Sequence, residues 1–321
     1  MKPPRRAVLI AFAVLVAGGY LRLYLEDHAT KSFRHEGLLS EPLDIDVREK
    51  IGQNSAVVAL AGLRTLVASF ASLRATEQFT NTEWPELDES VNTTVQLSPK
   101  TGYYWDIGGW HLAYNAAAFY RNDPHLSSLR AEAESRRWVT KGKEFFERGT
   151  RNNPDNWRLA AALGNLYSSA YHFPEDEKAV AAYSRSWATG KADPRVRRNL
   201  LQARARVGED PKVLLAELRD ILQSDPRSAV PSMLALRYVL EAKITPPDDP
   251  VARAVQIFGS EERALRILGT YFTDYLDRMP QTGVETAIRL LERRKGIAPD
   301  SPESNIRLRE ELSARNYGFE R

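Results

Sequence analysis

The five histidines are the first residues to consider for chemistry, because imidazole transfers protons near neutral pH and binds transition metals. They are His28, His35, His111, His125 and His172. No two of them stand four residues apart, and the chain contains no His-Glu-x-x-His pattern, so the spacing of a helical zinc site is missing. We interpret them as isolated surface or turn side chains and expect neither a catalytic residue nor a metal site.

The other motifs that support nucleophilic or phosphate chemistry are also missing. The chain has no cysteine, which removes thiolate nucleophiles, thiolate metal sites and disulfides. It has no Gly-x-Ser-x-Gly elbow and no Gly-x-Gly-x-x-Gly loop, and Thr189-Gly190-Lys191 lacks the upstream glycine of a phosphate-binding loop. The sequence therefore predicts a non-catalytic protein with no cofactor and no small-molecule substrate.

The charge balance does not indicate a nucleic-acid partner. The chain has 321 residues, with 45 Lys and Arg against 42 Asp and Glu, and its formal net charge is +3. The two signs are interspersed, whereas nucleic-acid binding needs a concentrated basic face. We expect no nucleic-acid partner. The hydrophobic share of 43% is sufficient to bury a sizeable core.

The N-terminus has the pattern of a membrane anchor. A basic lead, residues 1–6, precedes an apolar run, residues 7–25, whose only charge is Arg22. As a helix this run spans about 28 Å at ~1.5 Å per residue, which is just enough for a bilayer core. The positive lead places the N-terminus in the cytoplasm, so we expect a single-pass membrane protein whose bulk is extracytoplasmic, in the periplasm.

A cleaved secretory signal is the alternative for the apolar run. Small residues occur near its end, but no Ala-x-Ala site closes it, which favours an uncleaved anchor. Both interpretations place the rest of the chain outside the cytoplasm. Residues 26–46 are charged and are predicted to form a stalk.

Residues 47–98 are predicted to form an N-terminal pair of helices. Small and apolar residues recur at helical spacing from position 47 to about 76, and a second helix opens at Trp84. A second membrane span is the alternative for the first helix. Arg64 lies within it among several polar residues, so a buried helix of a water-exposed domain is favoured.

Small residues stand at fixed places in two helical halves that follow. The first half reads Trp105-x2-Gly108-Gly109-x2-Leu112, the second reads Gly142-x3-Phe146-x2-Gly149-x4-Pro154, and Ala160-x2-Leu163-Gly164-x2-Tyr167 repeats the first half. Small residues let paired helices touch, and large residues fill the space between pairs. Further second-half frames begin at Ala179, Leu214, Leu268 and Ala287.

These frames resemble the tetratricopeptide repeat (TPR), a helix–turn–helix unit of 34 residues. The resemblance covers residues 99–300 and departs from the family pattern at Gly108, Leu112 and Ala160, where leucine, tyrosine and tryptophan are usual. It implies an all-α fold, with an N-terminal transmembrane helix followed by an irregular α-solenoid of antiparallel helix pairs. Residues 301–321 would form a C-terminal capping helix and tail.

The resemblance also implies a binding groove. In this family the second, fifth, ninth and twelfth positions of a first helix line the inner groove; here these are Tyr103, Asp106, Trp110 and Ala113, then Arg158, Ala161, Asn165 and Ser168. Aromatic and arginine side chains anchor protein partners. The groove that a protein or peptide would occupy is therefore formed by Tyr103, Asp106, Trp110, Arg158 and Asn165. The alternative is that Trp105 and Trp110 are both core residues.

The predicted function is a membrane-anchored scaffold or assembly factor of a bacterial-type envelope. An alternative is an extracytoplasmic ligand-binding or enzyme-accessory domain that holds a glycan or lipid on the aromatic cluster from Tyr103 to His111. A closed pocket around Tyr103, Trp110 and His111 would favour this alternative, whereas an open groove favours the scaffold. A purely structural spacer predicts that no aromatic side chain of this region is exposed.

Overall fold

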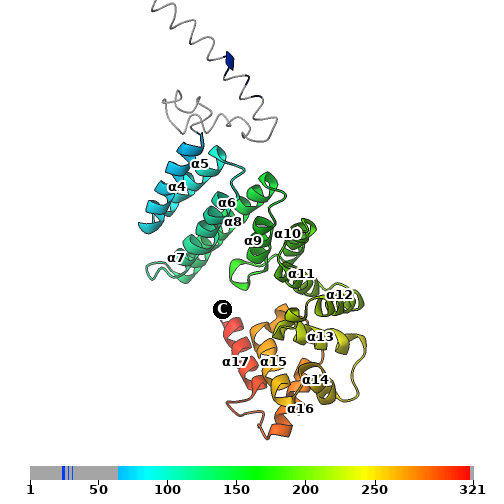
Figure 1. The fold of residues 1–321 in the computed structure, drawn as a ribbon. Coiled ribbons are helices and arrows are strands. Elements are labelled where there is room, and N and C mark those ends of the chain that lie inside the picture. Colours follow the sequence, from blue (N-terminus) through cyan, green and yellow to red (C-terminus); the bar gives the residue numbers. More distant parts are fainter. Residues whose placement is uncertain (1–23, 26–27, 29–30, 32–63, 319–321) are drawn as a thin grey trace, which may run out of the picture. The chain divides into compact units, whose positions relative to one another are not determined.

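The computed structural model describes residues 24–25, 28, 31 and 64–318, and every regular element within these ranges is a helix (Figure 1). The predicted all-α class is confirmed for this part of the chain. The predicted stalk and all but the last two residues of the predicted anchor, residues 7–25, lie outside the described residues or are described only at single positions. No helix of the described ranges is both long and apolar enough to cross a membrane.

The chain divides at Asn153 into two units, each with its own set of packed helices. Unit 1 comprises α4 (Arg64–Thr80), α5 (Trp84–Leu97), α6 (Gly102–Trp110), the π-helical segment η2 (His111–Ala116), α7 (Ala117–Arg121) and α8 (Ser128–Asn152). The backbone stays helical at the junctions of α6, η2 and α7, so these three form one continuous helix. α4 packs on α5, and the continuous helix packs on α8.

Glycines bring the continuous helix and α8 into close contact. A Cβ atom on Gly108 would lie 2.8 Å from the Phe145 ring, and one on Gly109 would overlap the Phe146 ring. Gly149 of α8 in turn faces Trp105, which is buried. The predicted role of these small residues, close approach of paired helices, is confirmed for this pair.

Unit 2 begins at Pro154 and is a succession of short helices. They are α9 (Trp157–Ser168), η3 (Ala170–His172), α10 (Asp176–Ala188), α11 (Pro194–Arg206), α12 (Pro211–Ser224), η4 (Pro226–Ser228), α13 (Pro231–Ile244), α14 (Pro250–Phe258), α15 (Glu261–Asp274), η5 (Leu276–Arg278), α16 (Val284–Lys295) and α17 (Asn305–Gly318). Asp193, Asp210 and Asp249 each accept a backbone N–H at a helix start and are followed by proline. This combination caps the helix and presets its first φ angle.

The sequence frames of unit 2 fall on helices that pack together. α9 packs on α10, where a Cβ on Gly164 would lie 2.6 Å from the Tyr183 ring. The frames that begin at Leu268 and Ala287 lie on α15 and α16, and these two helices pack on each other.

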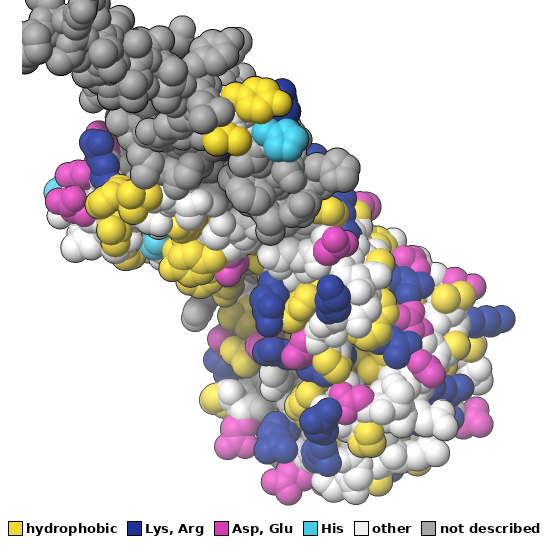
Figure 2. Space-filling model, turned by 45° about the horizontal axis from the view of Figure 1, so that its top comes forward, with side chains coloured by type: hydrophobic (Ala, Val, Ile, Leu, Met, Phe, Trp, Pro, Cys, Tyr) yellow, Lys and Arg dark blue, Asp and Glu magenta, His cyan; other side chains and the backbone are white. Residues whose placement is uncertain are grey.

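The core of unit 2 is continuous from α11 to α17 and includes the fully buried Leu218, Tyr238, Leu268 and Ile288. Its outer surface carries both signs of charge. Figure 2 shows Lys and Arg side chains interspersed with Asp and Glu over the lower part of the view, where unit 2 lies.

Candidate functional site

Tyr103, Asp106 and Trp110 lie on one face of α6, at positions i, i+3 and i+7. We call these three residues the α6 stripe. The side chain of Tyr103 is 66% exposed and that of Trp110 is 50% exposed, whereas Trp105 is only 3% exposed. The interpretation of both tryptophans as core is therefore wrong for Trp110 and correct for Trp105. A purely structural spacer was expected to expose no aromatic side chain in this region, and the exposure of Tyr103 and Trp110 contradicts that expectation.

Trp110 is held in place by its neighbour in η2. Its ring stacks on the Tyr114 ring, with the centroids 4.6 Å apart and an interplanar angle of 19°. Half of the Trp110 side chain stays exposed beside this stack, so part of the indole is available for a further contact. π-helical turns inside α-helices are frequent at functional sites, and nothing in the sequence pattern predicted this one.

The Asp106 carboxyl has no charged partner in this part of the structure. It reaches solvent, yet neighbouring atoms bury part of it, and this burial raises its pKa above the ordinary value of 3.8. No basic side chain of the described residues forms an ion pair with Asp106 or contributes to the shift of its pKa. The α6 stripe thus combines two exposed aromatic rings with an uncompensated carboxylate.

His111 is packed rather than free. Its Nδ1 lies 3.0 Å from the amide nitrogen of Asn115, and its ring lies 4.3 Å from the Phe79 ring of α4. An amide N–H donating to Nδ1 requires the neutral imidazole, and burial lowers the pKa of His111 in agreement with that form. This side chain closes the contact between α4 and the continuous helix.

The space beside His111 is too small for a ligand. Tyr103 and His111 line, with Ser72 and Thr76 of α4, a recess of about 30 Å³. That volume holds about one water molecule, whereas ligand pockets measure ~300–1,000 Å³. Trp110 is not part of its wall. A closed pocket around the three predicted residues is therefore not formed by the described residues.

A larger cleft of about 480 Å³ lies between α5 and α8 and was not predicted from the sequence. Its charged walls neutralise one another, because Lys141 pairs with Asp88 and Arg148 donates to Asn92 at 2.5 Å. The Arg148 guanidinium also lies over the Trp105 ring, 5.6 Å from its centroid, and burial lowers its pKa. The only indication of this cleft in the sequence was the seven-residue spacing of Lys141 and Arg148, which places both on one face of a helix. This cleft is best explained as a packed polar contact.

Arg158 and Asn165 share one face of α9, in unit 2. The Arg158 guanidinium stacks on the Trp157 ring of its own helix, with a distance of 4.8 Å to the centroid. The Asn165 carbonyl oxygen accepts hydrogen bonds from the Tyr183 hydroxyl at 2.8 Å and from the Asn199 amide at 3.3 Å. Both residues are exposed, but they already make contacts within unit 2.

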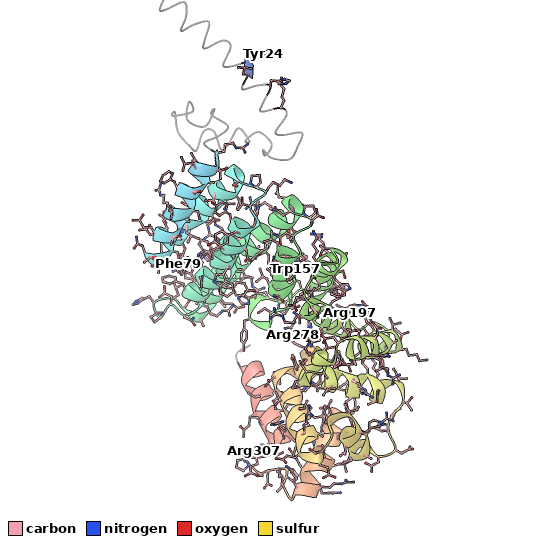
Figure 3. All side chains as sticks on the ribbon, viewed as in Figure 1. Tyr24, Phe79, Trp157, Arg197, Arg278 and Arg307 are labelled. Atoms are coloured by element: carbon pink, nitrogen blue, oxygen red, sulfur yellow. The ribbon has the colours of Figure 1, made fainter. Side chains whose placement is uncertain are left out.

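A second polar cluster of unit 2 was also missed from the sequence. Arg206 is nearly buried and donates to the Asp176 carboxylate at 2.5 Å and to the Ser168 hydroxyl at 2.8 Å. Arg278, labelled in Figure 3, donates to the Ser168 carbonyl at 2.9 Å and to Asp176. These partners are more than a hundred positions apart in the chain, so periodicity could not have revealed them.

The structure therefore places the five predicted residues in two groups. Tyr103, Asp106 and Trp110 share a face of unit 1, and Arg158 and Asn165 share a face of unit 2. No group of three or more His, Asp or Glu side chains among the described residues could hold a metal ion. Comparison of the chain with protein-family models and with curated proteins finds no match.

Proposed function

We propose that this chain is a non-catalytic, membrane-anchored helical-repeat protein that binds another protein or peptide through the α6 stripe. The observation that carries the proposal is the exposure of Tyr103 and Trp110 on a helix whose opposite face is packed into unit 1. Tyrosine and tryptophan dominate the binding energy of many interfaces, and they lose little conformational entropy when they dock.

The packing around the α6 stripe supports a binding role. Gly108 and Gly109 hold α6 against α8, and the stack on Tyr114 fixes the Trp110 ring. A preorganised surface spends less free energy on ordering its own side chains when a partner arrives. The recess beside Tyr103 holds about one water molecule, so a protein surface suits this face better than a buried glycan or lipid.

In this proposal the repeats are of the TPR type, and residues 7–25 anchor them to the outer face of a bacterial-type cytoplasmic membrane. The anchor would restrict the search for a partner to the membrane surface. A scaffold or assembly role in the envelope follows from these two properties.

A photo-reactive residue in place of Trp110, in native membranes, tests the binding role. We expect a discrete adduct with a second protein, identified by mass. The matched control carries the same residue at Leu129 of α8, which is 83% exposed and lies away from the stripe in sequence. Reaction of the Trp110 position only within its own chain, or equal capture at Leu129, would contradict the proposal.

The topology can be tested separately, because the chain has no cysteine of its own. A single cysteine at Leu129 should react with a membrane-impermeant maleimide in cells whose outer membrane is permeable. A cysteine at Pro3 should react only after lysis. The reverse pattern would mean that the bulk of the chain lies in the cytoplasm.

A further inference from the structure

The α6 stripe is suited to one kind of partner side chain. Asp106 and Trp110 are four residues apart on the same helical face, so their side chains are neighbours, about 5–6 Å apart at Cβ. Tyr103 adjoins Asp106 from the preceding turn. We infer that the partner segment presents a lysine or arginine side chain whose cation stacks on the exposed part of the Trp110 ring and pairs with the Asp106 carboxylate. This inference rests on the proposed function and names the chemistry of the partner.

The other tryptophans of the chain support this assignment. Four of them carry a cation of this chain over the ring: Arg148 over Trp105, Lys141 over Trp138, Arg158 over Trp157 and Arg197 over Trp187. Trp110 is the most exposed of the six, and no basic side chain of the described residues lies over its ring. A guanidinium or ammonium within about 6 Å of an indole centroid is attracted by the electron density of the ring.

Two partly buried acids of the chain provide a comparison for the more exposed Asp106. Asp176 pairs with Arg206 and Arg278, and Asp88 pairs with Lys141. Asp106 has no such partner among the described residues, although burial already disfavours its charge. A partner that covered the stripe with apolar atoms alone would bury this carboxylate without compensation, which costs several kcal/mol for a fully buried charge.

An anionic partner is disfavoured by the same carboxylate. A basic side chain satisfies both halves of the stripe at once, because its charged head pairs with Asp106 while its face or stem covers the ring of Trp110. Charge-assisted hydrogen bonds of this kind form at ~2.7–2.9 Å and are stronger than neutral ones. The stripe therefore selects for a basic residue in an otherwise ordinary protein contact.

The test keeps Trp110 intact and places the photo-reactive residue at Tyr103 of the full chain in native membranes. We expect Asp106→Asn to lower the yield of the partner adduct several-fold, and Asp106→Lys to lower it about tenfold or more, which corresponds to ~1.4 kcal/mol. Asp106→Glu should retain most of the yield. Glu89→Gln, at an exposed acid of α5, is the matched control and should leave the yield unchanged.

The site of cross-linking in the partner decides whether a basic residue is involved. The captured peptide of the partner should contain a lysine or arginine, and replacing that residue with glutamate in the partner should restore the adduct of Asp106→Lys. Denaturant melts of the Asp106 variants check that unit 1 is still folded. If Asp106→Asn and Asp106→Lys both give the adduct in the same yield as the unaltered protein, the inference is overturned and the proposed function stands. If the photo-reactive residue gives no protein adduct at Tyr103 or at Trp110, the inference and the proposed function are both refuted.

Discussion

Unit 1 packs its helices through aromatic rings and small residues, and it leaves large apolar side chains in solvent. Phe145 and Phe146 of α8 contact the glycines of α6. Helix α4 buries Ala68, Ala75 and Gln78 but exposes larger residues at positions i, i+4 and i+7, namely Leu66, Phe70 and Leu73. Together with the α6 stripe, these exposed side chains give unit 1 two apolar surfaces.

Unit 2 relies much more on pairs of opposite charge. Glu241 is nearly buried and accepts hydrogen bonds from Arg219, Arg237 and Arg253. Asp176 connects Arg206 with Arg278 in the same way, and Figure 2 shows both signs of charge over this unit. Its polar side chains are largely satisfied within the unit.

The difference suggests a division of roles. A contiguous patch of exposed apolar side chains often marks an interaction site, whereas single exposed apolar residues are normal on protein surfaces. Unit 2 also exposes large apolar side chains, such as Tyr171, Val213 and Leu308, but each lies on a different element. Those of α4 and of the α6 stripe share a helical face, so the proposed docking role falls to unit 1. Variants of each unit test this difference, and they are described from the largest expected effect to the smallest.

The two tryptophans of α6 should differ most. Trp105→Ala should lower the free energy of unfolding by about 3–5 kcal/mol, because it removes a buried indole that also donates to the Pro99 carbonyl. Trp110→Ala should cost only about 0.5–1.5 kcal/mol, the value of a stacked aromatic pair. Denaturant melts of the two variants measure this. Equal losses would mean that Trp110 is also a core residue and would end the docking role.

The charge cluster of unit 2 should be the next most sensitive. Asp176→Ala leaves Arg206 and Arg278 without their carboxylate, and since the cluster is partly exposed we expect a loss of about 2–3 kcal/mol rather than the larger cost of a fully buried pair. Chemical denaturation measures it, and Glu285→Ala, which breaks an exposed pair, is the control. A loss no larger than that of the control would refute the importance of the cluster.

The glycine contacts should matter in both units. Gly109→Leu and Gly164→Leu should each destabilise by about 1–3 kcal/mol, because the new side chain meets the ring of Phe146 or of Tyr183. Ala118→Leu on an exposed position of α7 should change stability by less than ~0.5 kcal/mol. Melts of both glycine variants that match the unaltered protein would rule out the close helix contacts.

Unit 2 should lose stability in acid through Glu241. Burial alone would raise the pKa of this carboxyl, but the hydrogen bonds and charges of its arginine partners outweigh it and lower the pKa below the ordinary 4.5. The contribution of Glu241 to the stability of unit 2 is therefore complete above the pKa of this carboxyl in the unfolded chain. It is lost as the pH falls through the lower pKa of the folded state. Stability measured between pH 6 and pH 3 should fall, and Glu241→Gln should flatten that fall. An identical slope in the variant would contradict this account.

The apolar face of α4 should give the smallest effect. If its face is free, Phe70→Glu should change the free energy of unfolding by less than ~0.5 kcal/mol. A loss of several kcal/mol would show that this side chain is covered in the full chain.

Much of the local structure follows from residue spacing alone. Apolar residues at helical intervals predict the helices, and the Asp-Pro pairs such as Asp210 and Pro211 mark where some of them begin. The glycines at 108, 109 and 164 predicted close helix contacts, and these contacts are present. The pairing of α15 with α16 was not predicted, because both carry the same frame and a frame does not say which helix is its partner.

The site was predicted only in part. The resemblance to the tetratricopeptide repeat implied a common groove-lining face for Tyr103, Asp106 and Trp110, and these residues share a face of α6. The engagement of Asn165 by Tyr183 and Asn199 could not be deduced, because hydrogen-bond partners depend on how α9, α10 and α11 pack. The π-helical turn at 111–116 also has no signal in the residue pattern.

The helical class and the small-residue contacts follow from the amino-acid sequence, because they depend on residues within a few helical turns of one another. The packing of distant helices makes Trp105 buried and leaves Trp110 exposed, although both are tryptophans of one helix. The same packing leaves Asp106 without an ion pair among the described residues, whereas Asp176 pairs with two arginines. Burial and pairing depend on which helices pack against a face, and those helices come from distant parts of the chain.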